Sequence, residues 1–166
     1  MSMHERDPVY VYVCASPLQL NLERNQLGSE GAAMLVSAIA ATASMTTCNL
    51  RKNRLGVEGW TIIFNTLRDS PTSKIATWNL YGEKLGPEIA KPLAEYISVT
   101  TWCVTKISVN YNLLGDAGAT ILCDALRESK VTKVQELDLS KNNINLDGVK
   151  AVVAMAAVVA SLTLVR

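Results

Sequence analysis

One short apolar motif returns five times along the chain. The segment 20-LNLERNQLG-28 is followed by 50-LRKNRLG-56, 80-LYGEKLG-86, 109-VNYNLLG-115 and 139-LSKNNIN-145. Aligned on the central polar residue, the copies are separated by 28, 30, 29 and 30 residues. A fixed period of this length is typical of repeat architectures, in which each copy is one supersecondary unit. The chain is therefore expected to fold as a stack of similar units.

Each copy begins with the pattern of a short buried strand. Apolar residues stand three and five positions before the central polar residue, and another stands two positions after it. These residues are Leu20, Leu22 and Leu27; Cys48, Leu50 and Leu55; Trp78, Leu80 and Leu85; Ile107, Val109 and Leu114; and Leu137, Leu139 and Ile144. Alternation with period two predicts a strand, and the chain then turns inward.

A segment of helical period follows each turn. Two apolar columns four residues apart predict one buried helix face: Leu35, Ile63, Leu93, Leu122 and Val152, then Ile39, Leu67, Ile97, Leu126 and Ala156. Glycines at the helix entry, which we expect to let neighbouring helices approach closely, are Gly31, Gly59, Gly118 and Gly148. Ser29 and Asp116 are of the residue types that cap helix N-termini, and we predict that role for them.

The segments 17-PLQLNLERNQLGSEGAAMLVSAI-39 and 104-VTKISVNYNLLGDAGATILCDAL-126 carry this pattern almost in full. The chain resembles leucine-rich repeat proteins of the ribonuclease-inhibitor-like subtype over about residues 17–160. The resemblance implies an α/β horseshoe-shaped solenoid with a parallel β-sheet on its concave side and α-helices on its convex side. Physical reasoning agrees, because one strand and one helix cannot bury their own apolar faces whereas stacked copies share a core.

The central polar residues are predicted to be structural, because an amide at a buried turn bonds backbone groups that would otherwise be unsatisfied. They are Asn25, Asn53, Glu83, Asn112 and Asn142. The third repeat departs from the pattern, with Glu83 for asparagine, Ile89 for glycine and Pro92 inside the expected helix. Proline removes a helical hydrogen bond, so we expect a kink or a shortened helix there.

The two ends suggest the domain organisation. Residues 1–16 are predicted to be an N-terminal tail or capping strand, and residues 17–166 a leucine-rich repeat domain of five repeats. Leu162 and Val165 predict the start of a sixth strand. The last expected helix, residues 147–161, has hardly any polar face, although solenoids normally end in a polar cap. We therefore expect either a longer array or packing of this edge on another polypeptide.

Composition limits the classes of function. The length of 166 residues argues for one domain. The formal net charge of +1 argues against a surface that neutralises nucleic-acid phosphates. No signal peptide is visible, and the apolar stretch 149–165 is interrupted by Lys150, Ser161 and Thr163, so we expect a solenoid helix rather than a membrane anchor.

The sequence also offers little for catalysis or metal binding. The four cysteines form no CxxC pair, and His4 is the single histidine, so neither a zinc site nor a Cys–His nucleophile can be assembled. HExxH, GxxxxGK[ST] and GxGxxG motifs are absent from the sequence. We predict a cytoplasmic protein with reduced thiols, no cofactor and no enzymatic activity.

The residues between the core positions of the strands are expected to form a polar concave face, basic near Arg51 and acidic near Glu136. The predicted partner-binding residues are Asn21, Glu23, Asn49, Arg51, Asn79, Tyr81, Lys106, Asn110 and Asp138. Arg51 and Tyr81 are the strongest candidates, because arginine and tyrosine are enriched among the residues that dominate interface energetics.

The resemblance implies a non-enzymatic scaffold that binds a partner protein on the concave face. Two alternatives remain open. The apolar C-terminal edge predicts a structural subunit of a larger assembly, or self-association, which native size would reveal. A regulator of small GTPases, similar to the leucine-rich-repeat activator of Ran, is the weaker alternative, because no segment of this chain carries a specific match; a GTP hydrolysis assay would test it.

Overall fold

The computed structural model describes residues 18–70, 72–99 and 103–166 of the chain. The predicted N-terminal tail or capping strand, residues 1–16, lies outside the described residues, as do His4 and Cys14.

Strands and helices alternate along the described chain. The strands are β1 (Leu18–Asn21), β2 (Met45–Asn49), β3 (Thr77–Asn79), β4 (Lys106–Ser108), β5 (Glu136–Asp138) and β6 (Leu164–Val165). The helices are α1 (Gly28–Ala41), α2 (Gly56–Arg68), α3 (Ala90–Val99), preceded by the 3₁₀ turn Pro87–Ile89, α4 (Gly115–Glu128) and α5 (Leu146–Ala156). The α/β solenoid predicted from the repeat is confirmed.

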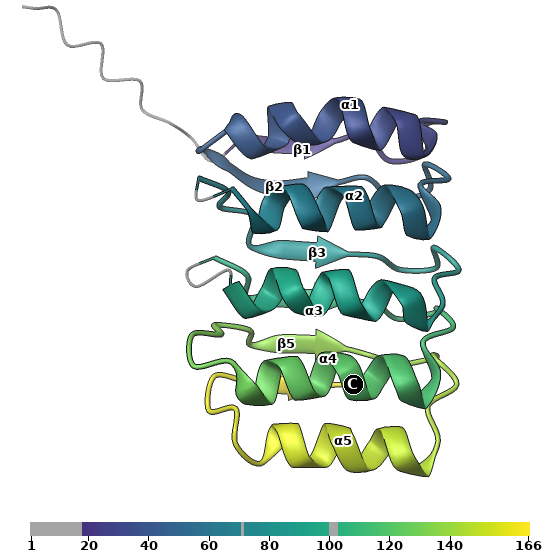
Figure 1. Cartoon of the computed structure of the whole chain (residues 1–166), viewed down its shortest axis with the longest axis vertical. Coiled ribbons are helices and arrows are strands. Elements are labelled where there is room, and N and C mark those ends of the chain that lie inside the picture. The colour runs from purple at the N-terminus through teal and green to yellow at the C-terminus, as the bar shows by residue number, and fades with distance from the viewer. Residues whose placement is uncertain (1–17, 71, 100–102) are drawn as a thin grey trace, which may run out of the picture.

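The six strands form one parallel sheet in sequence order, and the helices stack in the same order in a second layer (Figure 1). Neighbouring strands lie about 4.8 Å apart, whereas packed helices need about 8 to 10 Å between their axes. A stack of such units therefore curves towards its sheet, which makes the sheet face the concave one.

The strand register keeps like residues in line. Trp78 pairs with Ile107, Ile107 with Leu137, and Leu137 with Val165, and the first three of these side chains are almost fully buried. In the next column Thr77 pairs with Lys106. Because successive side chains of a strand point to opposite faces, one column fills the core while the other faces out.

An aromatic cluster occupies the middle of the core. The rings of Trp60, Phe64, Trp78 and Tyr96 come from α2, β3 and α3, and the ring centres in contact lie 5.2 to 6.2 Å apart. The indole nitrogen of Trp78 donates to the Tyr96 hydroxyl at 3.2 Å. The second and third repeats thus share one apolar centre, which neither could bury alone.

The turn asparagines connect neighbouring repeats. The Asn112 amide nitrogen donates to the carbonyl of Val109 at 2.8 Å and to that of Leu80, in the preceding repeat, at 2.7 Å. Its oxygen accepts from the backbone N–H of Leu85 at 3.0 Å. Asn53 and Asn142 make equivalent bonds and, like Asn112, are buried.

The first and third repeats differ at this position. Asn25 is exposed, and its amide bonds the Leu22 carbonyl of its own turn at 2.8 Å. Glu83 has no amide, but its carboxylate accepts from the backbone N–H of Lys52, in the preceding repeat, at 2.7 Å. The third repeat therefore keeps a link to its neighbour through an acceptor alone.

The third helix is shortened, as the sequence predicts. It has 10 residues, whereas the other α-helices have 11 to 14. Pro92 is the third residue of α3, so its missing N–H falls in the first turn, where backbone donors have no partner within the helix. The shift of the helix start to Ala90 accommodates the proline.

The predicted N-caps are wrong. Ser29 and Asp116 lie inside α1 and α4, which begin at Gly28 and Gly115; these glycines have φ of +62° and +59°, a conformation that bends the chain into the helix without a side-chain cap. Asp116 instead serves the next repeat, because its Oδ1 accepts from the backbone N–H groups of Asn145 and Gly148 at the start of α5.

The predicted extent of the last helix is also wrong. α5 ends at Ala156 rather than at residue 161, because the chain turns and the N–H groups of Val158 and Val159 both bond the Met155 carbonyl. Ala156 is exposed, and Met155 and Val159 are buried instead. The predicted sixth strand is present as β6.

Three of the helix-entry glycines allow close approach of neighbouring repeats. If Gly59 carried a Cβ atom, that atom would lie 3.3 Å from the Cα of Ser29 in the preceding repeat. A Cβ atom on Gly118 would lie 3.3 Å from the Pro87 Cα, and one on Gly148 would lie 3.2 Å from the Asp116 Cα. At Gly31 the near neighbours belong to its own repeat.

In the described part of the chain, no helix has the length and apolar character that crossing a membrane requires.

We expect Asn112→Ala to lower the free energy of unfolding by about 2 to 4 kcal/mol, because it leaves buried backbone groups without partners. Asn25→Ala is the matched control and should cost less than about 1 kcal/mol, since water can replace an exposed amide. Urea unfolding followed by circular dichroism measures both. Equal losses for the two variants would contradict the structural role of the buried amide.

We expect the buried thiols to resist modification in the native protein. Burial raises the pKa of Cys48 to about 12 and that of Cys123 to about 11, and it also raises the pKa of the half-buried Cys103. Thiolates are the reactive species. In a Cys14→Ser variant at pH 8, iodoacetamide should alkylate Cys103 before Cys48 and Cys123, as peptide mass spectrometry would show. Early alkylation of Cys48 would contradict this packing.

Candidate protein-binding surface

The outward side of the sheet, which we call the open face, is formed by three polar columns. They are Gln19, Thr47, Thr77, Lys106 and Glu136; Asn21, Asn49, Asn79, Ser108 and Asp138; and Glu23, Arg51, Tyr81, Asn110 and Ser140. The helices cover the other side of the sheet (Figure 1). The structure thus places all nine predicted partner-binding residues on one surface.

The second column also shapes the ends of the strands. The Oδ1 atoms of Asn21, Asn49, Asn79 and Asp138 each accept from the backbone N–H two residues later, at 3.1 to 3.3 Å. Such contacts form the turns that asparagine and aspartate favour. This second role was not predicted from the sequence, although short polar side chains directly before a turn are its usual signal.

The end of the open face near β1 holds an engaged carboxylate. The Glu23 Oε2 accepts from the Asn49 amide at 3.1 Å, and its Oε1 lies 3.6 Å from the Lys52 Nζ and 3.9 Å from the Arg24 Nε. The Asn49 hydrogen bond, assisted by the positive charges of Arg51, Lys52 and Arg24, lowers the pKa of Glu23 against the opposing effect of burial. Glu23 is therefore ionised at neutral pH.

Arg51, Tyr81 and Tyr111 form a ladder across three consecutive repeats, which we call the Arg–Tyr ladder. The Arg51 guanidinium carbon lies 4.8 Å from the centre of the Tyr81 ring, and the Tyr81 and Tyr111 rings lie 5.0 Å apart at 58°. Arg51 and Tyr81 are half-buried, whereas 53% of Tyr111 is exposed. Stacking on a ring fixes the plane of a guanidinium and stabilises its charge.

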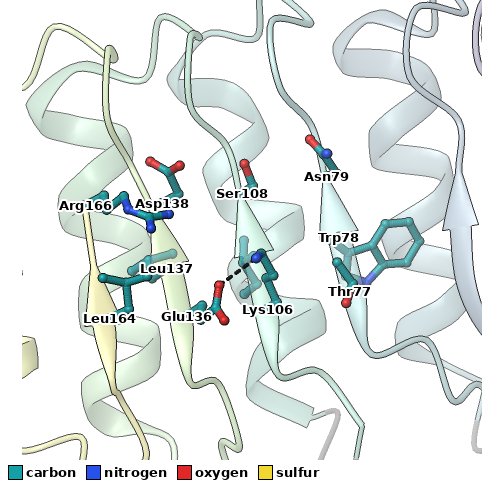
Figure 2. A pocket seen from close by; sticks show the side chains of 11 residues that line it. Thr77, Trp78, Asn79, Lys106, Ser108, Glu136, Leu137, Asp138, Leu164 and Arg166 are labelled. Atoms are coloured by element: carbon teal, nitrogen blue, oxygen red, sulfur yellow. Dashed lines mark ion pairs between the residues drawn. The ribbon is translucent and has the colours of Figure 1, made fainter.

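A hollow of about 220 Å³ lies at the other end of the open face, between β3 and β6. Figure 2 shows an ion pair among the side chains that line it, in which the Lys106 Nζ lies 2.6 Å from the Glu136 Oε2. Asp138 and Arg166 also line it. Pockets for small molecules usually measure about 300 to 1,000 Å³, so this hollow suits a side chain of a protein partner better.

Arg166 was not among the predicted site residues. The register pairs Glu136 with Leu164 and Leu137 with Val165, and the Arg166 carbonyl accepts from the Leu139 N–H at 2.8 Å. Extending the predicted sixth strand by one residue would have placed Arg166 in line with Asp138.

The open face contains charged and amide groups but no assembled metal site. Within residues 18–70, 72–99 and 103–166, no three His, Cys, Asp or Glu side chains gather closely enough to hold a metal ion. The geometry there supports hydrogen bonding and ion pairing with a partner.

A second surface feature lies at the C-terminal edge of the stack. A groove of about 510 Å³ runs between β6 and α5, with Leu139, Ile144, Val149, Val152 and Val165 among its lining residues. Next to it, Val153 and Leu146 are 62% and 70% exposed. In the inner repeats, the corresponding apolar side chains are buried against the next repeat, whereas at this edge they are exposed.

The model of a family described as "Leucine Rich repeat" matches residues 17–36 and 132–153. The matched segments contain β1 with the start of α1, and β5 with the start of α5. No curated protein matches the chain significantly. The family matches agree with the parallel sheet and its stacked helices.

We expect the ion pair in the hollow to add little to stability. Both side chains are partly exposed, and such pairs contribute less than about 1 kcal/mol. Lys106→Met and Glu136→Gln, combined in a double-mutant cycle followed by urea unfolding, should give a coupling energy below about 1 kcal/mol. A coupling of about 2 kcal/mol or more would show that the pair holds the sheet together.

Proposed function

We propose that this leucine-rich repeat protein is a non-enzymatic scaffold that binds a partner protein across the open face of its sheet. Leucine-rich repeat domains commonly mediate protein–protein interaction. The observation that carries the proposal is the alignment of three polar columns on a rigid parallel sheet, with the side chains supported by turns and by each other. A pre-organised surface binds with a smaller entropic cost than a flexible one.

The energetic centre of this surface is the Arg–Tyr ladder. Its aromatic and guanidinium groups combine contact area with directed hydrogen bonds, which is typical of residues that dominate binding. The hollow between Lys106 and Arg166 offers a second contact for a protruding partner side chain. The polar surroundings are consistent with a partner that associates reversibly.

A second candidate function rests on the C-terminal edge. The groove between β6 and α5 and the exposed Val149, Val153 and Leu146 favour packing of this edge on another polypeptide in a larger assembly. The cytoplasmic location and the GTPase-regulator alternative remain predictions from the sequence, with no residue assigned to either.

Site-specific photo-crosslinking tests where a partner binds. A photoreactive phenylalanine analogue is placed at Lys106 on the open face, at Lys91 on the exposed side of α3 as the matched control, and at Val153 on the C-terminal edge. After irradiation in native extract, we expect one set of proteins to crosslink at Lys106 and not at Lys91, identified by mass spectrometry.

The same experiment separates the candidates. Crosslinks at Val153 alone would favour the assembly role over the open-face scaffold, and equal products at Lys106 and Lys91 would contradict specific binding. Native mass of the purified chain, measured with and without extract, shows whether crosslinks at Val153 join copies of this chain or a different polypeptide.

A further inference from the structure

The guanidinium of Arg51 forms no close ion pair with the residues that the structure describes. Its Nε atom is buried and makes no hydrogen bond to any described residue. Throughout the described chain, no carboxylate lies within 4.0 Å of its guanidinium nitrogens. The Tyr81 ring covers one face of the group, and a planar guanidinium so fixed keeps its outer edge ready for two parallel hydrogen bonds.

The acidic residues nearest to this arginine are already engaged. Glu23 bonds the Asn49 amide and lies close to Lys52 and Arg24, and the Glu83 carboxylate accepts from the backbone N–H of Lys52. Arg51 acts on Glu23 only at longer range, through its charge, because the close contacts of Glu23 are with Asn49, Lys52 and Arg24. Among residues 18–70, 72–99 and 103–166, no side chain supplies an acceptor for its guanidinium.

Further basic residues share the same edge of the open face. The five strand-to-helix turns, residues 22–27, 50–55, 80–85, 109–114 and 139–144, hold six basic residues and two acidic ones in a chain of net charge +1. Arg54, Lys84 and Lys141 have φ near +58°, are exposed and make no ion pair with the described residues. Acidic residues of these repeats lie in the first turns of the helices, where the helix dipole favours them.

We propose, on the basis of the proposed open-face scaffold, that this edge binds an extended acidic segment of the partner protein. One carboxylate of the segment binds the Arg51 guanidinium, and its neighbouring chain packs on the exposed ring of Tyr111 and on the open part of the half-buried Tyr81 ring. Further carboxylates reach the unpaired cations Arg54 and Lys84 in the adjoining turns.

The arrangement favours single carboxylates over a phosphate group. A phosphate carries up to two charges and is bound best by several donors that converge on one point. Here the free cations Arg51, Arg54 and Lys84 belong to two different turns, and only Arg51 is backed by a ring. A series of separate carboxylates along a chain matches a series of separate cations.

Fluorescence anisotropy with a fluorescein-labelled peptide of alternating glutamate and serine tests the proposal at low ionic strength. The same peptide with glutamine for glutamate is the uncharged control. We expect the glutamate peptide alone to bind, and binding to weaken as salt screens the charges. Arg51→Gln should weaken binding about tenfold and Arg51→Lys about threefold, because lysine keeps the charge but not the planar pair of donors.

Variants at the ring separate stacking from charge. Tyr81→Phe keeps the ring and should change affinity by less than about twofold, whereas Tyr81→Leu removes the stack and should weaken binding several-fold. Lys91→Gln also removes one positive charge, but on the exposed side of α3 and away from the open face, so it should leave binding unchanged. Thermal unfolding of each variant confirms that the fold is retained.

Several results would overturn the proposal: no binding of the glutamate peptide, equal weakening by Lys91→Gln and Arg51→Gln, or tighter binding of a phosphoserine peptide or of duplex DNA. Crosslinking at Lys106 distinguishes failure of the acidic-segment proposal from failure of the proposed scaffold function. If the Lys106 crosslinks persist while the glutamate peptide does not bind, the open face holds a partner of different chemistry. If the Lys106 crosslinks are absent, the proposed scaffold function itself fails.

Discussion

The hydrogen bonds of the turn amides are the interaction on which the rest of this structure depends. At each buried turn, one asparagine side chain bonds the carbonyl of its own strand end and a carbonyl of the preceding repeat. Because an unpaired backbone group in a core is costly, this position fixes both the bend of the chain and the distance to the next repeat. The spacing of the strands and the alignment of the outward columns follow from it.

A fixed core leaves the first and third outward columns freer to vary than the second, whose asparagine and aspartate side chains also bond the backbone. Substitution of a buried leucine opens a cavity, whereas the outward columns contact mainly each other and the solvent. The partly exposed Lys106–Glu136 pair illustrates this, since such pairs add little to folding. Specificity for a partner can therefore change at these positions without loss of the solenoid, and for this reason the open face is the natural place to seek function.

The sequence predicted much of this fold, because the repeat period and the apolar positions are set by local alternation and by stacking. It failed where a residue's role depends on a neighbouring repeat. Asp116 has the chemistry of a helix cap, but the helix it serves is α5, and only the stacked structure shows that its carboxylate reaches Asn145. The end of α5 was missed because a run of alanine and valine continues the helical pattern beyond the point where the chain turns at Ala157.

For the open face, alternation in the strands predicted which side chains face outward, but not how they contact one another. The sequence carries no signal that Arg51 stacks on Tyr81 or that Asn49 bonds Glu23, because these contacts join residues that are 30 and 26 positions apart. The third repeat shows the consequence. Where the motif would place an asparagine, Glu83 accepts from the Lys52 backbone, while Tyr81 of the same turn supports Arg51. The repeat that departs most from the pattern thus supplies the ring that orients Arg51, whose buried Nε atom bonds no described residue. Departures from local rules are common where a protein has a binding role, which is why this repeat bears on the proposed acidic-segment site.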